Sequence, residues 1–310
     1  MSGMPKAFLI FPFSLAALAF AAEVPSPALL VLNKEEATLA IVDPGSGTVT
    51  GRVGTGESPH EVAVSEDGSQ AYVTNYGSRT PGNSLSVIDL AAQKEIRRVD
   101  LTPMQRTHGI AVAEGKVWFT AEGNKLIGRY DPAANRVDFV MGTGQNGTHM
   151  VWLSKENRQI YTANIASNSF SIFERAAGGS SDWNQTIIPV GKGPEGADLS
   201  PDGRQLWTAH SGDGGISIID VAEKRVIGTV DIGTKRSNRL KFTPDGKHVL
   251  VSDLQGGELV IGSCVAETDQ AACAGENPRR HFDAAGWDSR ICRGSWRQSC
   301  GICRSEDVGS

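Results

Sequence analysis

SPHEVAVSEDGSQAYVTNYG (58–77) contains a pattern that later segments of the chain repeat, and this repetition indicates the fold. The pattern is an alternating strand, a turn such as Pro-Asp-Gly, and a second strand that usually has an aromatic residue near its start. The later copies are residues 106–123, 147–165, 193–211 and 236–254. A repeat of this length is typical of propellers, solenoids and arrays.

Each repeat unit predicts four short strands. In the first complete unit these are HEVAVS (60–65), AYVTN (71–75), SLSVIDL (84–90) and EIRRVDL (95–101). Four antiparallel strands in a repeated unit describe one blade of a β-propeller. Residues 28–53 predict a further unit that lacks the first of the four strands. Four aromatic residues share one position in the second strand and are expected to pack between sheets: Tyr72, Trp118, Tyr161 and Trp207.

The N-terminus predicts export. Residues 1–22 have the features of a signal peptide: Lys6, an apolar run over residues 7–20, and small residues before the expected cleavage site. The chain is therefore expected to be periplasmic or secreted, with no membrane span after cleavage. A net charge of -5 and a pI of about 5.7 argue against a nucleic-acid partner.

Residues 23–261 carry the predicted propeller, and residues 262–310 break the pattern. All five cysteines lie in this tail, including a Cys-x-x-Cys at 300–303 that would suit a metal or redox module. A one-nucleotide slip explains the tail better. In the shifted frame, residues 277–287 can read TPEGILMQPDG, which matches GPEGADLSPDG (193–203). We therefore expect an aberrant, frameshifted and disordered tail, and a seven-bladed parent truncated here to about five and a half blades.

The strings AYVTNYG (71–77), IYTANI (160–165) and SLSVIDL (84–90) resemble the YVTN-repeat β-propellers, which are exported seven-bladed proteins. The resemblance covers residues 28–261. It implies an all-β propeller related to lactonases and to the propeller domain of nitrous oxide reductase. Propellers of this kind include enzymes, metal-bearing domains and binding scaffolds, so the resemblance implies a fold and no single activity.

One slot of the repeat, at the start of each first strand, holds polar or metal-capable side chains: His60, His108, His149, Glu195 and Asn238. Equivalent positions of a propeller face a shared centre, so these residues should meet. Three imidazoles and a carboxylate suit zinc, copper or iron. The sequence predicts a metal site at His60, His108, His149 and Glu195, with Glu195 alternatively a general base.

The ends of the second strands should open onto the same funnel. They add Asn75, Glu122, Asn164, His210 and Asp253 to Asn238 as expected ligand-binding residues. Three functions remain open. The first is binding of a small molecule or protein partner at the funnel. The second is a metal-dependent enzyme of the lactonase, hydrolase or redox type, and the third is an envelope scaffold or surface-layer protein.

Overall fold

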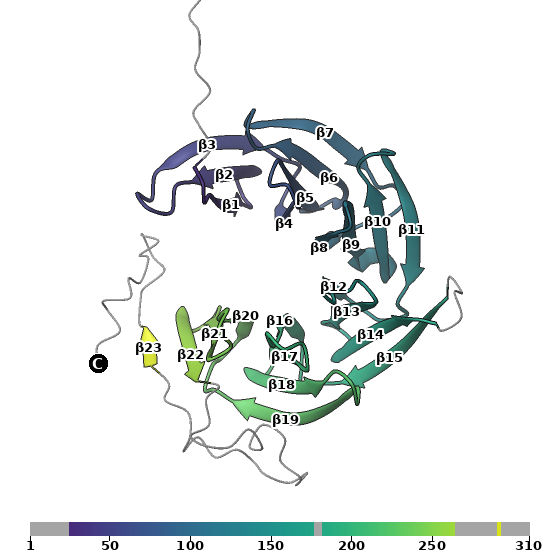
Figure 1. The fold of residues 1–310 in the computed structure, drawn as a ribbon, viewed down its shortest axis with the longest axis vertical. Coiled ribbons are helices and arrows are strands. Elements are labelled where there is room, and N and C mark those ends of the chain that lie inside the picture. Colours follow the sequence, from purple (N-terminus) through teal and green to yellow (C-terminus); the bar gives the residue numbers. More distant parts are fainter. Residues whose placement is uncertain (1–24, 177–181, 264–289, 293–310) are drawn as a thin grey trace, which may run out of the picture.

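The chain is an all-β propeller of six antiparallel sheets that follow one another around a ring (Figure 1). The computed structural model describes residues 25–176, 182–263 and 290–292. The predicted signal peptide, a seventh blade and nearly all of the predicted tail lie outside the described residues. No helix in the described part of the chain has the length and apolar character needed to cross a membrane.

The sheets form in sequence order. The first has β1 (Leu29–Asn33), β2 (Thr38–Val42) and β3 (Val49–Gly54). The second has β4 (Pro59–Val64), β5 (Gln70–Gly77), β6 (Pro81–Asp89) and β7 (Lys94–Asp100). The third has β8 (Thr107–Ala113), β9 (Lys116–Ala121), β10 (Leu126–Asp131) and β11 (Arg136–Gly142), with the 3₁₀ helix η1 (Glu122–Asn124) after β9.

The remaining sheets repeat this order. The fourth has β12 (Thr148–Leu153), β13 (Gln159–Asn164), β14 (Ser169–Arg175) and β15 (Trp183–Pro189). The fifth has β16 (Pro194–Leu199), β17 (Gln205–His210), β18 (Gly215–Asp220) and β19 (Arg225–Asp231). The sixth has β20 (Ser237–Phe242), β21 (His248–Asp253), β22 (Glu258–Ser263) and β23 (Arg290–Cys292), the last lying within the predicted tail.

The hydrophobic core is divided among the interfaces between neighbouring sheets. Within the described residues, each of the five interfaces from the first sheet to the sixth has its own buried cluster. The aromatic residues expected between sheets, Tyr72, Trp118, Tyr161 and Trp207, are all buried, which confirms that expectation. Packing between sheets therefore holds the first strands β4, β8, β12, β16 and β20 side by side around the centre of the ring.

Each of these inner strands has a bulge at its start. In the second sheet, Pro59 pairs with Asn75 and Val62 pairs with Val73, so two residues of β4 oppose one residue of β5. The same register shift occurs in β8, β16 and β20, and β12 has a one-residue version. A bulge redirects the side chains of the extra residues. The slot identified in the sequence, the second residue of each inner strand, lies in this bulge.

A buried threonine hydroxyl joins one bulge to the next sheet. The hydroxyl of Thr120 accepts the Gly109 N–H at 2.8 Å and donates to the His149 carbonyl at 2.7 Å. The hydroxyl of Thr74 likewise donates to the His108 carbonyl at 2.6 Å. These bonds fix the backbone that carries two of the histidines.

Replacing Thr120 with valine should therefore destabilise the protein. The change keeps the side-chain shape but leaves the buried Gly109 amide and His149 carbonyl each without that partner. We expect the free energy of unfolding to fall by about 1–3 kcal/mol, measured by urea denaturation. The matched control is Thr229→Val at an exposed position of β19, which should change stability by less than about 0.5 kcal/mol. Equal losses in both variants would show that the hydroxyl bridge is unimportant.

Candidate functional site

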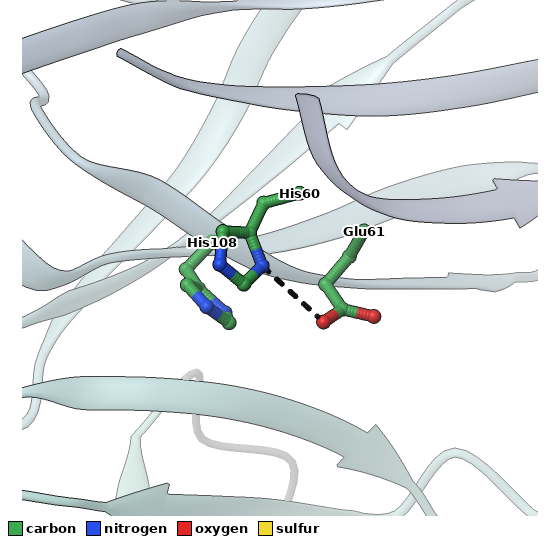
Figure 2. A group of neighbouring side chains, drawn as sticks. All are labelled: His60, Glu61 and His108. Carbon is green, nitrogen blue, oxygen red and sulfur yellow. Dashed lines mark ion pairs between the residues drawn. The ribbon is translucent and has the colours of Figure 1, made fainter. Parts of the chain in front are cut away.

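Three imidazoles lie close against one another where the inner strands β4, β8 and β12 begin, with their planes tilted. The ring centroids of His60 and His108 are 3.8 Å apart, and those of His108 and His149 are 3.6 Å apart. His60 and His149 are 6.4 Å apart, so His108 is the middle ring, and it is 1% exposed. Figure 2 shows His60 and His108 side by side, with the Glu61 carboxylate facing His60. Residues far apart in the sequence thus share one centre.

The fourth and fifth slot residues extend this centre with a carboxylate and an amide. Glu195 Oε1 lies 3.7 Å from His149 Nε2. The Asn238 amide donates a hydrogen bond to the same carboxylate. All five slot residues therefore belong to one cluster.

An ion pair that the repeat pattern did not indicate crosses the ring beside them. Arg239 of β20 donates to the Glu61 carboxylate of β4, and its Nη1 lies 3.6 Å from Glu195 Oε1. Glu61 Oε1 is 3.5 Å from His60 Nδ1. Both residues directly follow a slot residue, and the bulge turns them toward the centre as well. Their proximity depends on how the second and sixth sheets are placed across the ring, which the spacing within a single repeat does not indicate.

Glu122, one of the predicted funnel residues, contacts the histidines. Its position in the repeat differs from the one that the sequence predicted. The first residue of β4 pairs with Asn75, whereas the first residue of β8 pairs with Ala121. Glu122 therefore lies one residue beyond the Asn75 position and is equivalent to Tyr76. Glu122 Oε1 is hydrogen-bonded to Nδ1 of His149.

Tyr76 is a site residue that sequence reasoning missed. Its hydroxyl donates to Glu122 Oε2 at 2.7 Å, and its ring centroid lies 5.4 Å from His60 and 5.5 Å from His108. Lys34 Nζ lies 5.6 Å from the centroid of the Tyr76 ring. A correct alignment of the second strands would have found Tyr76 and Glu122 together.

Two of the other funnel residues form structural hydrogen bonds instead of facing the histidines. Asn75 donates to the hydroxyls of Ser84 and Ser86 and accepts the Gly56 N–H at 3.0 Å. Asn164 donates in the same way to two serines of β14. Both amides tie the end of the second strand to the third strand of the sheet.

His210 and Asp253 occupy the same position in the fifth and sixth sheets. His210 Nδ1 lies 3.0 Å from Asp213 Oδ1. Asp253 accepts the backbone N–H groups of Lys235 and Arg236, and so holds the loop before β20. His210 and Asp253 form no hydrogen bond, ion pair or ring contact with His60, His108 or His149.

Charge and burial set distinct protonation states within the cluster. Burial lowers the pKa of His108 well below its usual range, and the His149 and His60 imidazoles lower it further. Burial also opposes a charge on His149, but the Glu122 and Glu195 carboxylates outweigh it and raise the pKa of His149. Burial would raise the pKa of Glu195, yet His149 and Arg239 hold that pKa below its ordinary value. Burial and Glu122 raise the pKa of Tyr76 to about 12.

The polar atoms of this cluster are incompletely satisfied. Seven buried side-chain nitrogen or oxygen atoms in the described residues lack a hydrogen-bond partner. Five of them belong to four residues: His60 Nδ1, His108 Nδ1 and Nε2, His149 Nε2 and Glu195 Oε2. Buried polar atoms are almost always paired in native proteins, so such a concentration marks a place for a ligand, water or ion.

Two overlapping groups have ligand atoms close enough together to hold a metal ion. They are His60 with Glu61 and His108, and His108 with Glu122 and His149. Both carboxylates already have partners, because Glu122 orients His149 and Glu61 pairs with Arg239. The unpaired atoms lie instead on the imidazoles and on Glu195. His108 is common to every arrangement.

A cavity of about 610 Å³ lies along the inner strands. Glu61, Gly196 and Arg239 line it, so it reaches the histidine cluster at the Glu61–Arg239 pair. Its walls continue along β8, β12, β16 and β20 as far as Ser154 and Glu66 near the turns that end the inner strands. The volume falls within the range of small-molecule pockets.

Known structures share the fold at low sequence identity. Hydrazine synthase of Kuenenia stuttgartiensis has a TM-score of 0.65 and 18% identity, over 76% of this chain and 73% of that chain. A putative 6-phosphogluconolactonase of Bacteroides uniformis has a TM-score of 0.61 and 17% identity, over 75% of each chain. The periplasmic gluconolactonase PpgL of Pseudomonas aeruginosa has a TM-score of 0.62 and 19% identity, over 74% of this chain and 73% of that chain. No family model and no curated protein matches the sequence.

The raised pKa of His149 predicts a pH-dependent effect of Glu122→Gln in the metal-free protein. His149 has a folded pKa above its unfolded value of 6.5, so its contribution to stability is complete below pH 6.5 and is lost as the pH rises through the folded value. Without the Glu122 carboxylate, burial should dominate and lower this pKa. The loss of unfolding free energy relative to wild type should therefore be larger at pH 5.5 than at pH 8, measured by urea denaturation. A loss that is the same at both pH values would contradict the assigned ion pair.

Proposed function

We propose that the centre binds one divalent transition-metal ion through His60, His108 and His149, with the Glu195 carboxylate beside it. The observation that supports this most is the set of buried, unpartnered nitrogen and oxygen atoms on these four residues. Because none of these atoms is open to solvent, they suit a small ion held at close range better than a pool of water. Imidazole and carboxylate donors are ligands of zinc, copper and iron.

The charges around the cluster support a cation. Three carboxylates, those of Glu61, Glu122 and Glu195, lie against the guanidinium of Arg239 and the imidazoles. These carboxylates outnumber the one guanidinium that pairs with them in a mostly buried place. Buried charges are expensive unless they are paired or bind a metal ion, and one divalent ion would balance them.

The contacts behind the donors also suit a metal centre. Glu122 holds His149 through Nδ1, which leaves Nε2 as the ligand atom, and Tyr76 holds Glu122. Asn238 holds Glu195 in the same manner. Metal-binding imidazoles usually have their second nitrogen fixed by a carboxylate or carbonyl, which sets the tautomer and the direction of the lone pair.

The reaction that this arrangement supports best is hydrolysis of a small cyclic ester. A bound divalent ion with an open position polarises a carbonyl and acidifies water. The low pKa of Glu195 keeps this carboxylate ionised, so that it can accept a proton from the water that attacks the ester. One of the structurally similar proteins is described as a putative 6-phosphogluconolactonase and another as a periplasmic gluconolactonase. The signal sequence expected in residues 1–22 supports action in the periplasm or outside the cell.

Metal analysis tests the ion site. The purified chain, equilibrated with excess zinc, copper or cobalt and then desalted, should retain one equivalent by mass spectrometry. His108→Ala should lose it, because His108 is the middle ring. The matched control is His210→Ala, which removes another buried imidazole with an unpartnered Nε2 and should leave the metal content unchanged. A wild-type protein without metal would refute the proposal and leave a metal-free small-molecule site as the alternative.

A lactone assay tests the reaction. Metal-loaded protein should hydrolyse six-membered sugar lactones faster than the spontaneous background, followed by acid release at constant pH. Glu195→Gln should keep the metal if the three histidines suffice and should lower kcat by about 10²–10⁴-fold, the usual contribution of a general base. Retention of both metal and kcat in this variant would exclude Glu195 as the base. Hydrolysis that chelators leave unaffected would exclude the ion.

A further inference from the structure

The cavity along the inner strands and the guanidinium of Arg239 belong together. We propose that this cavity is the substrate chamber of the centre and that Arg239 holds a carboxylate of the substrate at its inner end. The inference rests on the proposed metal centre and adds to it the direction of approach and the chemical class of the ligand.

The Arg239 guanidinium retains one donor atom without a hydrogen bond. Nη2 is bound to the Glu61 carboxylate, whereas Nη1 is buried, has no hydrogen-bond partner and lies within ion-pair range of Glu195, 3.6 Å from its Oε1. The arginine fork matches a carboxylate with two parallel hydrogen bonds, which gives it both strength and orientation. Arg239 lines the cavity and contacts Glu195, so a ligand at this end of the cavity meets the guanidinium one side chain away from the histidine cluster.

Two lysines also line the cavity. Lys241 Nζ lies 2.9 Å from Asp198 Oδ1, and Lys155 Nζ donates to the Pro201 carbonyl at 3.0 Å. Among the lining residues, Arg239 is the cation that lies between the Glu61 and Glu195 carboxylates. An acidic group at that end of the cavity would meet its Nη1, which has no hydrogen bond.

An aromatic ring packs beside the histidines. The Tyr76 ring centroid lies 5.4 Å from His60 and 5.5 Å from His108, and its hydroxyl is held by Glu122. The Arg106 guanidinium carbon lies 4.9 Å from the centroid of the same ring. The cavity reaches the cluster from elsewhere, at the Glu61–Arg239 pair.

Acetate binding to the cobalt-loaded protein tests the assignment, followed by the visible spectrum of the bound cobalt. Arg239→Gln should weaken acetate by about tenfold or more, the effect of losing a hydrogen bond between charged groups. Lys241→Gln is the matched control, because this residue lines the same cavity with its charge already paired, and acetate affinity should stay within about twofold of wild type. Cobalt content is measured for every variant.

The Glu61→Gln variant should change the affinity for acetate in the opposite direction. Removing the internal carboxylate frees the guanidinium, so acetate should bind more tightly if Arg239 is the anion-holding residue. If the Glu61–Arg239 pair served only to hold the fold, both variants would weaken acetate together. Unchanged affinity in Arg239→Gln with cobalt still bound would overturn the Arg239 assignment alone. A wild-type protein that retains none of zinc, copper or cobalt would refute the metal centre and this inference with it.

Discussion

The geometry of the centre depends on a joint between neighbouring sheets at the start of the inner strands. There the bulge turns the slot residue out of the strand pairing, and a threonine hydroxyl from the second strand binds the carbonyl of the next slot residue. The joint fixes the backbone of His108 and His149, and packing between the sheets fixes their spacing. The short distances between the imidazole rings follow from these two constraints.

Much of the fold and the five slot residues of the site could be predicted from the sequence, because both follow from its repeats. A repeated strand–turn–strand phrase implies equivalent sheets, and equivalent sheets bring His60, His108, His149, Glu195 and Asn238 together. The funnel positions were harder to predict from the sequence. Glu122 is shifted by one position from Asn75, since β9 ends at Ala121 and η1 follows. Asn75 and Asn164, which share one position, form hydrogen bonds within their own sheets.

The Glu61–Arg239 ion pair could not be predicted from the sequence, for a different reason. The two residues lie in the second and sixth sheets, and their contact is set by the diameter of the ring. Repeat spacing shows which residues occupy equivalent positions, but it does not show which of them reach across the hole. The fold alone does not indicate a reaction, since one protein of similar structure is described as a hydrazine synthase and another as a gluconolactonase. The chemistry was inferred from the unpaired buried atoms of this chain.

The contact between Glu61 and Arg239 also orders events during synthesis. A contact that joins residues 178 positions apart cannot form until nearly all of the intervening chain has been made. Chains emerge from the ribosome N-terminus first, and contacts between distant residues form slowly. The cluster around His60 and His108 can therefore be completed only after the ribosome has delivered the sixth sheet.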